Sequence, residues 1–174
     1  VTFLLLFFIA CTPGVHAAVV SSPKDTLTRE KISTAADHTI QFVTPTGIAN
    51  GNTVTLTFEA GFNIASVVTG DVTVEGAAVT SAAPSGQVLT ITCGSSNVVA
   101  ASGTADIVIS NGHITNPGSV GDYTITIGGT FGDTGVIAIP IVTDDQIAVT
   151  GDIGFSITFS LSTTTCSLGT LTTG

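Results

Sequence analysis

Basic residues are nearly absent from this 174-residue sequence. Three Lys and Arg residues stand against 12 Asp and Glu residues, giving a formal net charge of −9. The three are Lys24, Arg29 and Lys31, and neither Lys nor Arg occurs after them. Proteins bind nucleic acids and anionic membrane surfaces largely through Lys and Arg. The sequence therefore argues against both classes of partner.

Tyr and Trp are also scarce. The chain has no Trp and a single Tyr, Tyr123, beside nine Phe residues. Tyr and Trp are the aromatic residues that usually anchor binding surfaces, because they combine a large apolar ring with a polar tip. Most Phe residues alternate with polar neighbours and are expected to point inward. Glycan binding therefore remains only as an alternative function.

Catalytic signatures are missing as well. No Gly-x-Ser-x-Gly elbow and no CxxC or HxxxH spacing occurs, so a nucleophilic serine site or a zinc site has no recognisable motif. We interpret His38, next to Asp37, as half of a hydrogen-bonded turn pair, and His113 as a solvated loop residue. The sequence predicts a protein that is not an enzyme and has no organic cofactor.

Calcium is the one metal for which hard oxygen ligands are present. Four Gly-Asp pairs and one Asp-Asp pair occur, but no D-x-D-x-D-G cassette gathers them. Asp next to Gly also suits turns without any metal. The weak calcium candidates are Asp71, Asp122, Asp133, Asp144, Asp145 and Asp152.

The first seventeen residues are typical of an export signal. An apolar run over residues 3–10 is much shorter than the roughly 20 residues that span a bilayer as a helix. Thr, Pro and Gly follow it, and then Val15, His16 and Ala17 give a small-x-small cleavage pattern. We predict cleavage after Ala17 and a mature chain without a membrane span. Lipid attachment to Cys11 and a retained core helix are the alternatives.

The chain after residue 37 alternates apolar and polar residues with a period of two. Val54, Leu56 and Phe58 alternate with threonines, and similar runs follow at intervals, separated by Gly, Pro and Asn. This pattern indicates short half-buried strands. Seven or so such strands predict an all-β fold, an antiparallel two-sheet sandwich. Pro140 places the apolar run 136–142 at a sheet edge, because proline cannot donate to a ladder.

One short motif refines the fold class. The residues GDYTI, with Tyr123 at their centre, resemble the tyrosine corner of immunoglobulin-like sandwiches, in which a Tyr hydroxyl binds nearby backbone. An ordinary interfacial Tyr is the alternative reading. Ile125 stands where antibody domains have Cys, and Trp is absent, so the resemblance is to the wider immunoglobulin-like architecture.

Longer stretches resemble modular secreted surface proteins of bacteria and their adhesin-like sandwich domains. The stretches are HTIQFVTPTGIANGNTVTLTFEAGF and ITNPGSVGDYTITI, within residues 38–127. The resemblance implies an extracellular or cell-surface location. It assigns no functional residue.

The sequence predicts four segments: a signal peptide at 1–17, an N-terminal segment at 18–36, the sandwich at 37–149 and a truncated second β module at 150–174. The second module is suggested by VTGD at residues 149–152, which repeats residues 68–71, and by alternation from Phe155 to Leu161. A Cys93–Cys166 disulfide is one pairing open to an exported chain. Cys93 as a buried thiol, or Cys166 paired elsewhere, are the others.

These observations together predict a secreted or cell-surface structural or adhesive module that contacts other surface or matrix proteins. Two further hypotheses stay open. One is glycan binding, and the other is assembly into a filament or surface lattice by strand addition through the run that starts at Phe155.

Overall fold

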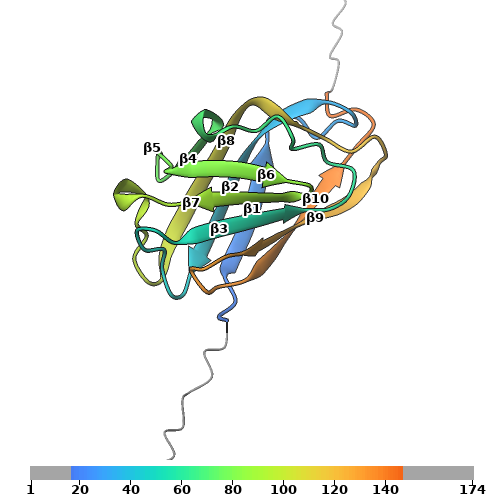
Figure 1. Cartoon of the computed structure of the whole chain (residues 1–174). Coiled ribbons are helices and arrows are strands. Elements are labelled where there is room, and N and C mark those ends of the chain that lie inside the picture. The colour runs from blue at the N-terminus through green and yellow to red at the C-terminus, as the bar shows by residue number, and fades with distance from the viewer. Residues whose placement is uncertain (1–16, 147–174) are drawn as a thin grey trace, which may run out of the picture.

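The computed structural model describes residues 17–146 and shows an all-β sandwich of two antiparallel five-stranded sheets (Figure 1). The first sheet has the order β1 (Ser21–Leu27), β2 (Ala35–Thr44), β8 (Gly103–Thr115), β4 (Val72–Val74) and β5 (Ala77–Ala78). The second has the order β10 (Gly135–Ile141), β9 (Gly121–Gly128), β3 (Thr53–Phe58), β7 (Val88–Thr92) and β6 (Ser81–Ser85). Two 3-10 turns, η1 (Thr69–Asp71) and η2 (Ser95–Asn97), lie in the connections. The predicted signal helix and second module lie outside the described residues.

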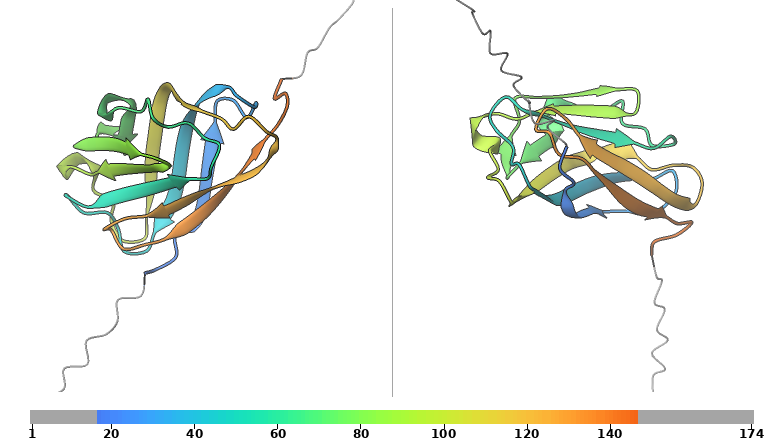
Figure 2. Two further views of the ribbon diagram at one scale, coloured as in Figure 1. Left: turned by 45° about the vertical axis from the view of Figure 1, so that its right-hand side comes forward. Right: turned by 90° about the horizontal axis from the view of Figure 1, so that it is seen from below.

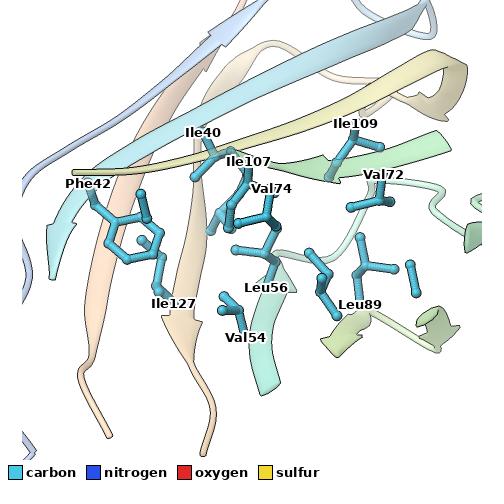
Figure 3. Close-up of a cluster of buried hydrophobic side chains, with 14 of the residues drawn as sticks. Ile40, Phe42, Val54, Leu56, Val72, Val74, Leu89, Ile107, Ile109 and Ile127 are labelled. Atoms are coloured by element: carbon cyan, nitrogen blue, oxygen red, sulfur yellow. The ribbon is translucent and has the colours of Figure 1, made fainter. Parts of the chain in front are cut away.

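The predicted alternation builds the core. Along β2 every second residue from Ala36 to Thr44 is buried, and β3 buries Val54, Leu56 and Phe58 against it from the other sheet. Figure 3 shows side chains of the two sheets meeting in one apolar layer. Burying each such side chain contributes about 1.5–3 kcal/mol relative to leaving it exposed. No helix among residues 17–146 is long and apolar enough to cross a bilayer.

Two boundaries differ from the sequence prediction. The sandwich begins before residue 37, because β1 pairs with β2 along most of its length. The second difference is at Asn111 and Gly112, which belong to the Gly and Asn residues that separate the predicted runs but do not form a turn between strands. They lie inside β8, where both residues have positive φ (69° and 61°) and the pairing with β2 shifts register. An extra stretch of β8 therefore bulges out of the ladder.

The strand order matches part of the immunoglobulin arrangement. Strands β1, β2, β8 and β4 follow the A-B-E-D order of that fold, and β10, β9 and β3 follow its G-F-C order. The hairpin of β6 and β7 adds to the second sheet beside β3 but comes after β4 in the chain. The tyrosine corner is confirmed, since the hydroxyl of Tyr123 donates to the carbonyl of Ser119 at 3.1 Å.

The first and last strands close one side of the sandwich. The chain before β1 makes a parallel bridge from Val19 to Thr134, and the chain after β1 makes another from Lys31 to Val142. Between these bridges β1 crosses to pair with β2 in the other sheet, while β10 runs about 26 Å at 3.3 Å per residue. The described chain therefore enters at one end of the sandwich and leaves at the other, as Figure 1 shows.

Candidate functional site

The sequence candidates fall into four separate places. One lies at the β8 bulge, one where the chain leaves β10, one inside the core and one among the loops at the opposite end. Figure 2 shows the strands of the two sheets running between the loops at the two ends of the sandwich.

The β8 bulge presents an Asp-His pair. The Nδ1 atom of His113 lies 2.6 Å from Oδ2 of Asp71, and the side-chain amide of Asn111 donates to Oδ1 at 2.7 Å. The carboxylate of Asp71 is 4% exposed, whereas 40% of the His113 side chain is exposed. His113 is thus a partnered strand residue, not the solvated loop residue that the sequence suggested.

These contacts explain the acidity of Asp71. The bond from His113, the backbone N–H of Val68 and the amide of Asn111 together lower the pKa of Asp71 to about 2. Asp71 therefore stays ionised across the ordinary pH range. The hydrogen bonds of the described residues include no Ser or Thr hydroxyl on the ring of His113. The pair fastens the bulge to η1.

An ionic contact lies where the chain leaves β10. Arg29 donates from Nε and Nη2 to the carboxylate of Asp145 at 2.9 Å, and the backbone N–H of Glu30 donates to the same carboxylate at 2.8 Å. These bonds raise the pKa of Arg29 and lower that of Asp145 to about 2. Lys31 lies 3.8 Å from Asp144 beside it. Two of the three basic residues therefore form ion pairs at one place, where the chain leaves β10.

A buried pair lies in the core. The Nδ1 atom of His38 is 2.6 Å from Oδ2 of Asp25, and both side chains have no exposed surface. The partner of His38 is thus Asp25 on β1 and not its chain neighbour Asp37, whose carboxylate accepts from the N–H of Gly112. The sequence interpretation was wrong here because the side chains of adjacent strand residues point to opposite faces.

The opposite loop end holds a buried carboxylate. Asp133 accepts from the hydroxyl of Thr44 at 2.5 Å and from the hydroxyl of Thr46 at 2.9 Å, and it has no exposed surface. These bonds tie the β9–β10 loop to the β2–β3 loop. A small open cavity of about 210 Å³ lies at this end of the sandwich, lined by Thr46, Gly47, Ile48, Ala49, Asn52, Val98, Val99 and Phe131.

The calcium candidates do not converge in the described residues. Asp71, Asp133 and Asp145 are already hydrogen-bonded at three different places, and Asp144 lies beside Lys31. Asp122 is exposed on β9, and Asp152 lies outside the described residues. No group of three or more His, Cys, Asp or Glu side chains placed to hold a metal occurs within residues 17–146. Calcium binding stays a sequence prediction.

Cys93 lies on the inward face of the chain directly after β7. Its thiol is buried, and burial raises its pKa. The other residue of the predicted disulfide, Cys166, lies outside the described residues, so that pairing stays a prediction.

Comparison with known proteins finds no matching protein-family model and no matching curated protein. One similar solved structure is that of BslA, a bacterial hydrophobin. It shares 15% sequence identity, and the match covers 70% of this chain and 98% of that chain with a TM-score of 0.48. A likeness at this identity concerns the β architecture alone.

Proposed function

We propose that this sandwich is a non-enzymatic structural module of an exported protein and that it carries tension between the chain segments at its two ends. The observation that carries the proposal is the placement of those ends. Force applied through residues 17 and 146 runs along β1 and β10, and the residues that flank these strands form a parallel bridge at either end.

The backbone bonds at the bridges would be loaded together. At the first bridge, Thr134 donates to the carbonyl of Ala18 and accepts from the N–H of Val20, at 2.8 and 2.9 Å. At the second, Val142 donates to the carbonyl of Glu30 and accepts from the N–H of Ile32, both at 2.9 Å. Tension along the strands strains the bonds of each bridge side by side. Peeling from one end would instead break them one after another.

The ionic contact strengthens the point where force would enter. Arg29 and Asp145 form a two-nitrogen contact at the exit of β10, directly beside the second bridge. The side-chain amide of Asn116 also donates to the carbonyls of Arg29 and Lys31, at 2.8 and 3.0 Å. Paired hydrogen bonds of Arg with a carboxylate fix geometry more firmly than a single ion pair.

The proposed location outside the cell rests on the sequence. The leader pattern ending at Ala17 favours export. The absence of Lys and Arg after residue 31 fits a module that meets external proteases, because trypsin-like enzymes find no cleavage site there.

The alternative of strand addition is weakly supported by the described edges. At the outer edge of β6, the N–H and the carbonyl of Ala82 both bond the hydroxyl of Thr69, and Pro84 on the same edge has no N–H. β5 is only two residues long. β1 has a bulge at its start, and its flanks bridge to β10. Short or covered edges such as these discourage pairing with another chain.

Single-molecule stretching of the full chain tests the proposal. Click-reactive residues introduced at positions 17 and 146 load both bridges lengthwise. The matched control uses positions 33 and 146, which lie at the same end of the sandwich and peel the second bridge open. We expect an unfolding force several-fold higher for the first pair. Equal forces in the two geometries would reject a tension-bearing role, while glycan-array binding by the same chain would favour the recognition alternative.

A further inference from the structure

We propose that the outer face of the second sheet binds ice through rows of threonine hydroxyls. The face is formed by β9, β3 and β7, the central strands of that sheet. We call it the threonine face and define it by its outward threonines: Thr53, Thr55, Thr57, Thr90, Thr92, Thr124 and Thr126. Binding through this face does not depend on the tension-bearing role.

The alternation that fills the core also turns these threonines outward. Every second residue of β3 from Val54 to Phe58 is buried, and the residues between them are threonines. Residues 89–92 of β7 and 124–127 of β9 show the same pattern, with Leu or Ile inside and Thr outside. Because alternate side chains of a strand point to opposite faces, the threonines gather on one face of the sheet. Thr57 and Thr126 are exposed, and the others are partly exposed.

The strand register places the threonines side by side. Three cross-strand pairs lie directly opposite one another: Thr57–Thr126, Thr55–Thr90 and Thr53–Thr92. Gly128 of β9 lies opposite Thr55 on its other side, and a Cβ there would be 3.3 Å from the hydroxyl oxygen of Thr55. The glycine therefore leaves that hydroxyl uncovered. The result is a two-dimensional array of hydroxyls and methyl groups.

The hydroxyls in the middle of the array are free to bind water. Those at the margins are engaged, since Thr124 donates to Glu59 and Thr92 accepts from Ser81. Within residues 17–146 no side-chain hydrogen bond involves the four central hydroxyls, which are those of Thr55, Thr57, Thr90 and Thr126. A hydroxyl both donates and accepts, so each can take the place of one water molecule in a lattice. The β-branched side chain is stiff, so holding it in place costs little entropy.

The spacing of these hydroxyls is close to that of the water lattice in ice. Neighbouring strands lie about 4.8 Å apart, and alternate residues of one strand lie about 6.8 Å apart. Water oxygens joined tetrahedrally by hydrogen bonds of about 2.75 Å form a hexagonal lattice that repeats about every 4.5 Å in one direction and about every 7.3 Å at right angles to it. The two sets of repeats agree to within roughly a tenth. Strand twist limits this agreement to neighbouring side chains, so the four central hydroxyls are the part that matches.

The threonine face lacks the charge that other surfaces of the molecule carry. The outward residues of β9, β3 and β7 include a single charged residue, Asp122, near one end of β9. The outer face of the first sheet instead bears Lys24, Asp37 and Asp106. Charged groups would have to give up their hydration water to contact a lattice, which is costly. On a chain with a net charge of −9, this nearly uncharged face suits a neutral surface such as ice.

Other occupants fit this face less well. The cores of protein interfaces are enriched in aromatic residues and Arg, and the outward residues of β9, β3 and β7 include neither. The flat sugar rings of a crystalline polysaccharide pack on aromatic rings, which this face also lacks. A charged mineral surface would require an array of charged side chains. Ice requires neither rings nor charges, only hydroxyls at the right spacing.

Slow growth of ice from a dilute solution of the full chain tests this binding, with the fraction of protein taken into the ice as the readout. Thr57→Tyr places a ring above the middle of the face and should keep the chain in the liquid. Thr26→Tyr is the matched control, because it makes the same change at an exposed threonine of β1, in the other sheet. We expect the parent chain and the control to enter the ice several-fold more than Thr57→Tyr.

Circular dichroism checks that each variant is folded, and Thr126→Tyr on the neighbouring strand takes the place of Thr57→Tyr if that variant does not fold. Equal partition of the parent chain and the face variant would overturn the proposal, because the threonine face would then make no difference. A parent chain that stays in the liquid but adsorbs to crystalline cellulose would assign the face to a polysaccharide and reject ice binding.

Discussion

The ring of His113 and the carboxylate of Asp71 join two elements that are far apart in the sequence, β8 and the η1 turn, through a 2.6 Å contact. The contact fixes a bulge whose backbone has positive φ at two successive residues. A side-chain bond thus stabilises a backbone geometry that the ladder alone does not favour.

Asp71→Asn should destabilise the fold by about 1–3 kcal/mol, because a buried acceptor of three hydrogen bonds is replaced by a group that accepts on one atom only. Urea unfolding at pH 7 measures the change. Asp122→Asn, at an exposed position on β9, serves as the control and should leave the midpoint almost unchanged. Equal effects of the two substitutions would contradict the structure.

Acid should unfold the protein between about pH 4 and pH 2. The pKa values of Asp71 and Asp145 are both lowered to about 2, while an unfolded Asp titrates near 3.9. The unfolded chain therefore takes up protons first, and the stability present above pH 4 is lost as the pH falls through that window. Circular dichroism during acid titration follows the loss. The double variant Asp71→Asn/Asp145→Asn should show a shallower acid limb.

Asp145→Asn should open the end of the sandwich without unfolding the core. The variant loses the charge that pairs with Arg29, so the amides of Ile32 and Val142 should exchange their hydrogens faster, while those of β3 should not change. Hydrogen-exchange NMR resolves the two groups. Lys31→Gln, which removes a solvated pair at 3.8 Å, should have little effect. Faster exchange throughout the molecule would mean that the contact supports the whole fold instead.

Tyr123→Phe should cost about 0.5–1.5 kcal/mol. The substitution removes the hydroxyl that donates to Ser119 but keeps the ring against Phe62. Thermal unfolding measures the loss. A neutral result would show that the ring alone matters at this corner.

Gly129→Ala should destabilise the protein by more than about 2 kcal/mol, because its φ of 132° strains any side chain and a Cβ would lie only 2.1 Å from the carbonyl oxygen of Thr53. Gly51→Ala is the matched control. It has a φ of 83° but open space around it, so only the conformational cost of about 1 kcal/mol applies. Similar losses at both positions would indicate that the close approach to Thr53 relaxes easily.

The strands with clean alternation were predictable from the sequence, and β1 was not. β3 alternates Thr with Val, Leu and Phe, so its buried face is visible in the residues themselves. β1, with the sequence SSPKDTL, shows no such face, because Asp25 occupies an inward position. A polar residue at a core position hides a strand from any analysis of periodicity.

The contacts of the candidate residues could not be predicted without knowing how the strands pair. Asp25 and His38 are 13 residues apart, and only the pairing of β1 with β2 brings them together. Arg29 and Asp145 are 116 residues apart. All three basic residues lie between residues 24 and 31, so the sequence limits any ion pair of the later acidic residues to contacts with that segment, and two such pairs form at the exit of β10. The sequence could not indicate which acids those would be.

The covered edge of β6 affects how copies of this module behave when they are packed closely together. Where many copies stand side by side, a bare strand edge would recruit its neighbours into cross-β stacks that grow without limit. A single hydroxyl on Thr69 occupies both backbone groups of Ala82, and the ring of Pro84 removes the next donor. Dense arrays of this module could therefore remain a population of separate folded units rather than seeds of a fibril.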